Sequence, residues 1–332
     1  MRIVLNSPLD MHLHLREGKM LQAVAPVTIN GFAGAVIMPN LVSPVDSLEK
    51  VRKYKEQIDA AAHAMPFTPY MTLFFKNYSR EELAAAKNEI IGIKLYPAGI
   101  TTQSENGVNN FEDIDETLSL MEEMQIPLLV HGESAGFVLD RESKFLEIYK
   151  RLTETFPKLH IIMEHITTAG AVDFVNRYPN ISATVTLHHL MITLDDVIGN
   201  LMEPDLFCKP IAKSPKDRER LREAVFSGHE KIMFGSDSAP HPRHKKECCG
   251  CAAGIFSAPV ALPMLAELFE NADRLDVLQN FVSDIACKRY GLHPPEKQVI
   301  LEEKPWVVPQ LYGKVKPFGA GSRLRWSVAG VR

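Results

Sequence analysis

Residues 10–16 read Asp-Met-His-Leu-His-Leu-Arg, an alternation of polar and apolar side chains that is typical of a β-strand. In an extended strand His12, His14 and Arg16 point to one face, and the three apolar residues between them point to the other. Two histidines one strand-step apart can hold a metal ion, since neutral imidazole is the commonest protein ligand for zinc-like ions. The guanidinium of Arg16 suits an anionic substrate group. By itself, the motif is equally compatible with a half-buried strand that carries two histidines by chance.

The composition is that of an ordinary globular protein, with 45% hydrophobic and 23% charged residues among 332. A net charge of -4 argues against a nucleic-acid-binding protein. No run approaches the roughly 18–20 apolar residues of a membrane span, and the first residues do not form a signal peptide. Five cysteines without framework spacing fit a reducing compartment. We therefore expect a cytoplasmic protein that binds neither nucleic acid nor membrane.

Strand-like apolar runs alternate with helical runs along the whole chain. Most strand-like runs are aliphatic without strict alternation, as expected of parallel strands that are buried on both faces. Eight such βα units predict a closed (β/α)8 barrel, a TIM barrel, formed as one domain over residues 1–332. Two more helices follow at 258–270 and 275–290, and the tail from residue 294 is expected to pack beside residues 2–5. The predicted strands are 11–15, 34–38, 69–75, 90–96, 126–130, 159–163, 181–187 and 231–235. The predicted helices between them include 47–64, 111–125, 141–156, 169–178 and 217–227, with further helix starts at Ser79 and Ser214.

Charged or metal-binding side chains stand at the carboxyl ends of five predicted strands. In a barrel of this type the active site lies at that end of the strands. Each residue alone has a plain structural explanation, such as a buried histidine or an aspartate that caps a turn. Their joint placement at one mouth favours a metal-dependent active site. These residues are His12, His14, Lys94, His131, His165 and Asp237.

The motifs around these residues closely resemble those of the amidohydrolase superfamily and, within it, of the dihydroorotase family of the compact bacterial type. The resemblance spans nearly the whole chain, from residue 10 to the segment around Trp306. The motifs are residues 10–16, Met-Pro-Asn at 38–40, Gly-Ile-Lys-Leu-Tyr-Pro at 92–97, Val-His-Gly-Glu at 130–133, Glu-His-Ile-Thr-Thr at 164–168 and Gly-Ser-Asp-Ser-Ala-Pro-His at 235–241.

The resemblance implies a barrel of the metal-dependent hydrolase type with two zinc ions in each subunit. His12 and His14 would hold the first ion together with Asp237, and His131 and His165 would hold the second. Lys94 would bridge the two ions as a carboxylated lysine. A carbamate offers one anionic oxygen to each ion, whereas a bare ammonium would be repelled by them. The alternative for Lys94 is a buried amine with a lowered pKa that acts as a base.

The resemblance also implies an enzyme, a cyclic amidohydrolase. Its reaction is the reversible cyclisation of N-carbamoyl-L-aspartate to L-dihydroorotate, a step of de novo pyrimidine (UMP) biosynthesis. A hydroxide that bridges the metal ions would attack the ring amide, and Asp237 would act as general base and then as general acid. Members of this family are commonly homodimers, which we expect here as well.

Substrate contacts carry over from the family residue by residue. Arg16 and Asn40 match a carboxylate-binding pair, and His241 matches a third contact. In structural terms alone, Asn40 could be a turn residue and His241 a surface imidazole. Ala253 and Lys209 are expected to contact substrate through their backbone, although relatives often have leucine at the position of Lys209. Thr101 and Thr102 match a mobile loop whose threonines reach the substrate, or else belong to a plain linker.

Two other functions fit the barrel less well. A cyclic amidase for a hydantoin, dihydropyrimidine or allantoin ring would not need the carboxylate contacts. A non-catalytic scaffold homologue would have lost ligands, and all six are present. Cys248, Cys249 and Cys251 lack the second ligand pair of a structural zinc site. Glu133 and Glu164 are expected to point away from the ligands beside them in sequence and to orient neighbouring groups. His188 and His189 are expected to play at most a supporting or packing role.

Overall fold

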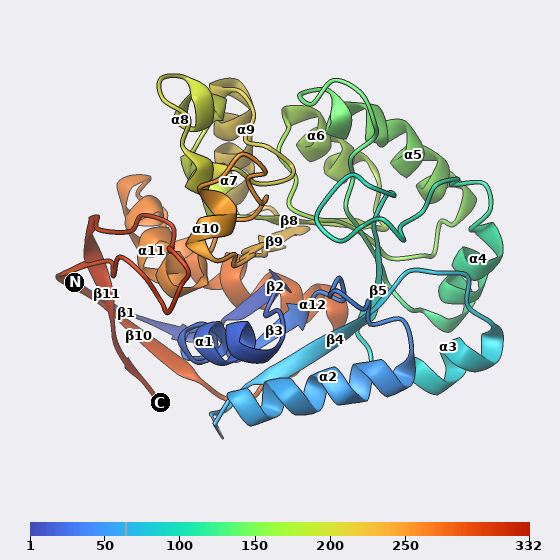
Figure 1. The fold of residues 1–332 in the computed structure, drawn as a ribbon, viewed down its shortest axis with the longest axis horizontal. Coiled ribbons are helices and arrows are strands. Elements are labelled where there is room, and N and C mark those ends of the chain that lie inside the picture. The colour runs from blue at the N-terminus through green and yellow to red at the C-terminus, as the bar shows by residue number, and fades with distance from the viewer. Residues whose placement is uncertain (64) are drawn as a thin grey trace.

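The computed structural model describes residues 1–63 and 65–332, and an eight-stranded parallel sheet forms its centre (Figure 1). The strands follow one another in chain order from β2 to β9, each hydrogen-bonded to the next. Every predicted strand is present, and the predicted (β/α)8 barrel is confirmed. The strands are β2 (Leu9–Leu13), β3 (Gly34–Ile37), β4 (Thr68–Phe74), β5 (Gly92–Leu95), β6 (Leu128–Val130), β7 (Ile161–Met163), β8 (Ile181–Val185) and β9 (Ile232–Phe234).

Helices surround this barrel, and their starts follow the sequence signals. Ser79 and Ser214 each form a capping box with the residue three positions on, which satisfies two free backbone N–H groups. No helix in the described part of the chain is both long and apolar enough to cross a membrane. Ala64, the last residue of the helix predicted over 47–64, lies outside the described residues. The helices are α1 (Gly18–Ile29), α2 (Leu48–Ala61), α3 (Arg80–Ala86), α4 (Asp115–Met124), α5 (Arg141–Thr155), α6 (Ala169–Arg177), α7 (Leu187–Met191), α8 (Leu194–Ile198), α9 (Pro215–Phe226), α10 (Arg243–Lys246), α11 (Ala261–Asn271) and α12 (Ile285–Tyr290).

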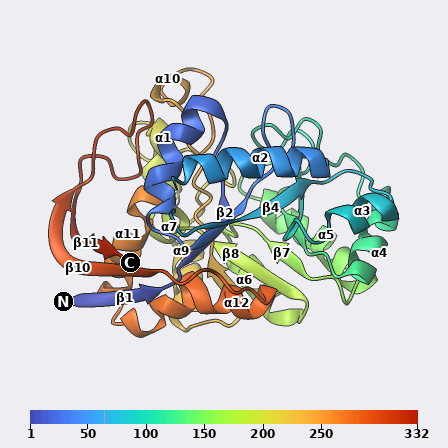
Figure 2. The same ribbon diagram turned by 90° about the horizontal axis from the view of Figure 1, so that it is seen from below.

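A small antiparallel sheet stands at the side of the barrel (Figure 2). The N-terminal strand β1 (Arg2–Asn6) pairs with β10 (Gln298–Val307), which pairs in turn with β11 (Arg323–Val331). The tail therefore packs beside the N-terminal segment as predicted, and it does so as two strands of a second sheet. Trp326 of β11 is fully buried, and its indole N–H donates to Glu270 of α11 at 2.9 Å.

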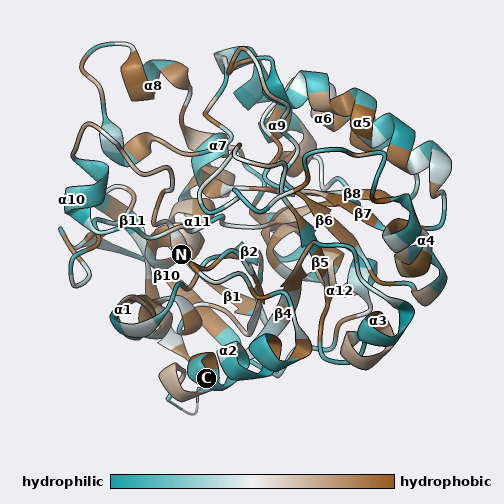
Figure 3. Ribbon diagram, turned by 45° about the vertical axis from the view of Figure 1, so that its right-hand side comes forward, coloured by the Kyte–Doolittle hydropathy of each residue, from teal (hydrophilic) through white to brown (hydrophobic). Residues whose placement is uncertain are grey.

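The barrel strands are rich in apolar residues, coloured brown in Figure 3, and these pack on both faces of the sheet. Inward-facing residues form one cluster, and outward-facing residues pack against the helices. Met11 belongs to the inner cluster and Leu13 to the outer one, so the prediction that they share a face is wrong. The pairing of β2 is irregular between Asp10 and Leu13, and an extra residue of this kind reverses the side-chain alternation. The inner cluster is formed by Leu9, Met11, Val36, Met38, Leu129, Ile162, Met233, Ile285 and Ala286.

The barrel closes between β2 and the segment that follows β9, through a few specific hydrogen bonds. The backbone N–H of Asp237 donates to the carbonyl of His12 at 2.9 Å, and that of His14 donates to Ser238 at 3.1 Å. The buried carboxylate of Asp10 accepts the backbone N–H of Ser236 at 2.7 Å and its hydroxyl at 2.5 Å. Burial raises the pKa of Asp10 to about 6 despite these bonds. Asp10 is therefore the side chain that joins the two ends of the sheet.

Replacing Asp10 by alanine is expected to lower the free energy of unfolding by about 2–4 kcal/mol, because the buried N–H and hydroxyl of Ser236 would lose their acceptor. Urea denaturation would measure the change. Asp276→Ala, at an exposed aspartate, is the matched control and is expected to change stability by less than about 0.5 kcal/mol. Equal stability of both variants would show that the Asp10 carboxylate does not hold the barrel closed.

Candidate functional site

The predicted site residues gather at the carboxyl ends of the strands, around a cavity of about 20 Å³. This volume holds about one water molecule. A larger cavity of about 550 Å³ lies at the opposite end of the barrel, but none of the predicted site residues line it. We place the site at the smaller cavity because the potential ligands converge there. The predicted residues that line it are His12, His14, Arg16, Asn40, Thr101, Thr102, His131, His165, Lys209, Asp237 and Ala253.

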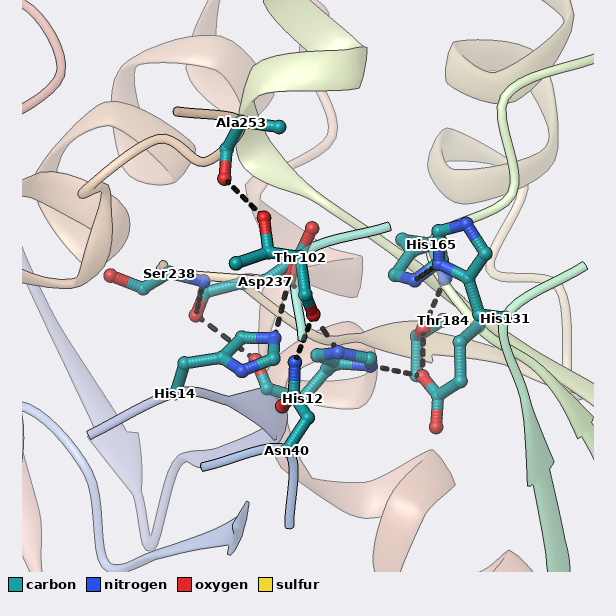
Figure 4. A network of polar contacts seen from close by, with 12 residues as sticks. His12, His14, Asn40, Thr102, His131, His165, Thr184, Asp237, Ser238 and Ala253 are labelled. Atoms are coloured by element: carbon teal, nitrogen blue, oxygen red, sulfur yellow. Dashed lines mark hydrogen bonds and ion pairs between the residues drawn. The ribbon is translucent and has the colours of Figure 1, made fainter. Parts of the chain in front are cut away.

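One group of potential metal ligands consists of His12, His14 and Asp237 (Figure 4). The Nδ1–H of His12 donates to a carboxylate oxygen of Glu164 at 2.8 Å, so the lone pair of His12 lies on Nε2. That Nε2 is 3.5 Å from Oδ1 of Asp237, and Nε2 of His14 is 3.1 Å from the same oxygen. Three ligand atoms thus face one point, and Glu164 fixes the tautomer of one of them.

A second pair of potential ligands consists of His131 and His165. Glu133 accepts the Nε2–H of His131 at 2.9 Å, which leaves the lone pair of His131 on Nδ1. This Nδ1 faces Nε2 of His165 at 3.2 Å. Two nitrogens on one tetrahedral zinc ion at about 2.0–2.1 Å would be about 3.3 Å apart. The spacing and tautomer of this pair therefore suit a shared metal ion.

One of the two glutamates corrects an expectation from the sequence. Glu133 does not point away from His131, the ligand beside it in sequence, because it accepts a hydrogen bond from that imidazole, whereas Glu164 accepts one from His12. β6 ends at Val130 and β7 at Met163, so both glutamates lie where strand alternation no longer applies. The expected orienting role of these carboxylates agrees with the contacts they make.

Lys94 stands fully buried on β5, and its Nζ has no hydrogen-bond partner among the described residues. Burial lowers the pKa of Lys94 to about 8, although the carboxylates of Glu164 and Asp237 oppose the shift. A buried polar group without a partner requires an explanation. A carbamate formed on Nζ would replace this unpaired donor by anionic oxygens that can bind metal ions.

Burial favours the neutral form of three histidines in the cluster, namely His14, His131 and His165. Burial lowers the pKa of His14 to about 3, lowers that of His131, and brings that of His165 well below its usual value. Burial raises the pKa of Asp237, but the hydrogen bond with His14 outweighs it and helps to hold that pKa well below its usual value. Neutral imidazoles beside an ionised carboxylate are the protonation states that metal binding requires.

A second part of the site is rich in hydrogen-bond donors. Nη2 of Arg16 lies 3.2 Å from Nε2 of His241, and the same nitrogen of His241 lies 3.0 Å from the carbonyl of Ala253. One imidazole nitrogen cannot accept from Arg16 and donate to Ala253 at the same time. Nδ2 of Asn40 donates to the carbonyl of Thr102 at 3.1 Å. A carboxylate between Arg16 and His241 would accept from both and remove this conflict.

Thr101 and Thr102 belong to a loop that lies across the mouth. The hydroxyl of Thr102 donates to the carbonyl of Ala253 at 3.4 Å (Figure 4). Lys209 contacts the same loop through its side chain, because its Nζ donates to the carbonyl of Ile100 at 2.7 Å. The sequence predicted only a backbone role for Lys209.

The backbone is strained where it presents these residues. Arg16, His165 and Asp237 have φ angles of +60°, +40° and +43°, a region that residues other than glycine rarely adopt. All three lie just beyond the ends of their strands. Strain of this kind concentrates at functional sites, where it sets the direction of a side chain.

The structure adds residues that sequence reasoning missed. Nζ of Lys246 donates to three backbone carbonyls, of Phe207, Ala252 and Gly254, at 2.8–3.0 Å and fixes the rim that carries Ala253. A lysine at the end of a short helix gives no sequence signal for this role. His188, His189 and Cys208 form another cluster of potential ligand atoms, but His189 is held by Thr186 and the carbonyl of Pro210.

Comparisons with known proteins identify the family of this chain. The model of the amidohydrolase family matches residues 4–292. A dihydroorotase of Helicobacter hepaticus is 42% identical over 98% of this chain and 97% of its own length. The crystal structure of a dihydroorotase from Campylobacter jejuni is 53% identical, covers 99% of this chain and 98% of its own, and superposes with a TM-score of 0.96. A dihydroorotase from Saccharomyces cerevisiae in complex with 5-fluoroorotic acid is 36% identical, with a TM-score of 0.92 over 100% of this chain and 98% of its own. The chain therefore belongs to the amidohydrolase family and, within it, to the dihydroorotases.

Proposed function

We propose that this chain catalyses the reversible cyclisation of N-carbamoyl-L-aspartate to L-dihydroorotate at a centre with two zinc ions. Membership of the amidohydrolase family implies a metal cofactor, and the relatives that are 36–53% identical are dihydroorotases. The observation that carries the proposal is the buried, unpartnered Lys94 close to the facing imidazoles of His131 and His165. A substrate with a free carboxylate also suits Arg16 and His241 better than an uncharged ring does.

We assign the ligands from the two groups of facing atoms. His12, His14 and Asp237 would hold one ion, His131 and His165 the other, and carboxylated Lys94 both. Bound metal ions supply Lewis-acid polarisation of the ring amide and make hydroxide available near neutral pH. The lowered pKa of Lys94 favours carboxylation, because only the neutral amine adds carbon dioxide.

Asp237 is the residue that moves the proton. Its side chain lines the cavity together with His12 and His14, and its lowered pKa keeps the carboxylate ionised. In ring opening it would take the proton of the attacking water and pass it to the amide nitrogen that leaves. In ring closure the same carboxyl would take the proton from the carbamoyl nitrogen as the C–N bond forms, and pass it to the oxygen that leaves as water.

The donor-rich part of the site would hold the substrate carboxylate. Arg16 can offer two parallel N–H groups, and His241 and Asn40 flank it. The neutral state of His241, whose pKa burial lowers to about 3, leaves one N–H for the carboxylate. We further propose that the chain acts in the cytoplasm as a homodimer. Sedimentation of the purified protein would test the oligomeric state.

Protein purified with zinc and bicarbonate is expected to hydrolyse L-dihydroorotate and to contain close to two zinc ions per chain. Absorbance of the substrate and metal analysis of the same sample would provide the two readings. Turnover of dihydrouracil but not of dihydroorotate, at full metal content, would replace the proposal by another cyclic amidase.

Lys94→Ala is expected to reduce turnover by at least 100-fold, because the bridge between the ions is lost. A short carboxylic acid such as acetate or propionate, added at high concentration, is expected to restore part of the activity by filling the space of the carbamate. Full activity of the unsupplemented variant would remove Lys94 from the site.

Glu164→Gln is expected to weaken zinc binding by about 10–100-fold, since a neutral amide oxygen accepts the Nδ1–H of His12 more weakly than a carboxylate does. Competition with a chromophoric chelator would measure the affinity. Glu147→Gln on the outer helix α5 is the matched control. Unchanged affinity in both variants would show that the Glu164 carboxylate does not support the ligand.

A further inference from the structure

The loop over the site, which we call the lid (residues 99–107), is a compact unit with its own hydrogen bonds. The hydroxyl of Ser104 accepts the backbone N–H of Thr101 at 3.0 Å and donates to its carbonyl at 2.8 Å. The backbone N–H groups of Gly99 and Gly107 both donate to the carbonyl of Ser104. These bonds close the lid on itself, so it can move as one body about its two ends.

The lid is closed in this structure. The remaining cavity of about 20 Å³ is far too small for a ring that carries a carboxylate. The carbonyl of Thr102 also accepts the N–H of Asn40, and in the proposed function this N–H donates to the substrate carboxylate. Substrate entry therefore requires the lid to open and the bond between Asn40 and Thr102 to break.

Among the described residues, three hydrogen bonds that involve side chains join the lid to the rim of the barrel. Two involve neutral groups, namely Asn40 with Thr102 and Thr102 with Ala253. The third is the bond from Nζ of Lys209 to the carbonyl of Ile100, which is the shortest of the three at 2.7 Å. A hydrogen bond from an ammonium is stronger than one between neutral groups.

Lys209 extends from a rigid support. Lys246 holds the carbonyl of Phe207 on one side, and His189 holds the carbonyl of Pro210 at 3.0 Å on the other. Cys208, immediately before it, is fully buried. The backbone of Lys209 is thus fixed, while its half-buried side chain reaches across to a segment that must move.

We infer that Lys209 is a positioning residue that latches the lid in its closed state through the carbonyl of Ile100. The inference rests on the proposed function, because it concerns the lid of the same site. Asn40 changes its partner from Thr102 to the substrate, but Ile100 has no such competitor. The latch can therefore hold the lid over bound substrate as well as over the free site, and the loss of the latch weakens closure over the substrate.

Lys209→Met removes the donor and keeps most of the length of the side chain. In zinc-loaded protein without substrate, the amides of residues 98–108 are expected to exchange with deuterium about tenfold faster than in the parent protein. The KM for L-dihydroorotate is expected to rise about tenfold, and kcat to change by less than about threefold. Lys209→Arg, which keeps a cationic donor, is expected to restore both readings to near the parent values. Lys76→Met, at an exposed lysine paired with Glu82, is the matched control.

Unchanged exchange in Lys209→Met would overturn the latch, and so would faster exchange with an unaltered KM or a failure of arginine to restore it. If Lys209→Met does not fold, Lys209→Gln, with a neutral donor on a shorter side chain, takes its place. The exchange measurement requires no turnover. A parent protein that is inactive toward dihydroorotate at full zinc content would therefore refute the proposed function and leave the test of the latch intact.

Discussion

The closure of the barrel between β2 and the segment after β9 is the constraint on which the site depends. The backbone hydrogen bonds that join these segments involve His12, His14 and Asp237, and the side chains of these three residues form one ligand group. Asp10 adds a buried carboxylate that binds Ser236, the residue just before Asp237. A barrel that failed to close at this point would lose the hydrogen bonds between its first and last strands. The three ligands would then no longer be aligned. The hydrogen bonds that close the barrel therefore determine both its stability and the geometry of the site.

The site also contains buried polar groups that the protein alone does not satisfy. Nζ of Lys94, Nδ1 of His165 and one carboxylate oxygen of Glu164 have no partner within the described chain. Each group of this kind costs free energy of folding, of the order of 1–3 kcal/mol. Their concentration at one mouth, beside strained residues such as Asp237, is what distinguishes a site from a well-packed barrel end.

Much of the fold and of the site could be predicted because parallel strands leave a strong apolar signal and place their carboxyl ends together. The strand positions and the convergence of His131, His165 and Lys94 follow from that rule. Other features depend on contacts that are remote in sequence. The irregularity in β2 lies in its pairing with β3, which is remote in sequence, so local alternation misplaced Met11 relative to Leu13. Helix α1 begins without a side-chain cap and contains Pro26, so the usual signals of a helix are missing.

The mouth of the barrel shows why loop residues are the hardest to predict. Irregular segments leave backbone carbonyls that no strand or helix satisfies, and a lysine ammonium can serve up to three of them. Lys246 binds three such carbonyls at the rim, and Lys297 does the same near the start of the strands. In the sequence each of these lysines stands between polar or charged residues, and no periodicity distinguishes it from other lysines. The path of the loops depends on hydrogen bonds between donors and acceptors that lie far apart in sequence. The position of the groups that face the substrate therefore becomes visible only in the folded chain.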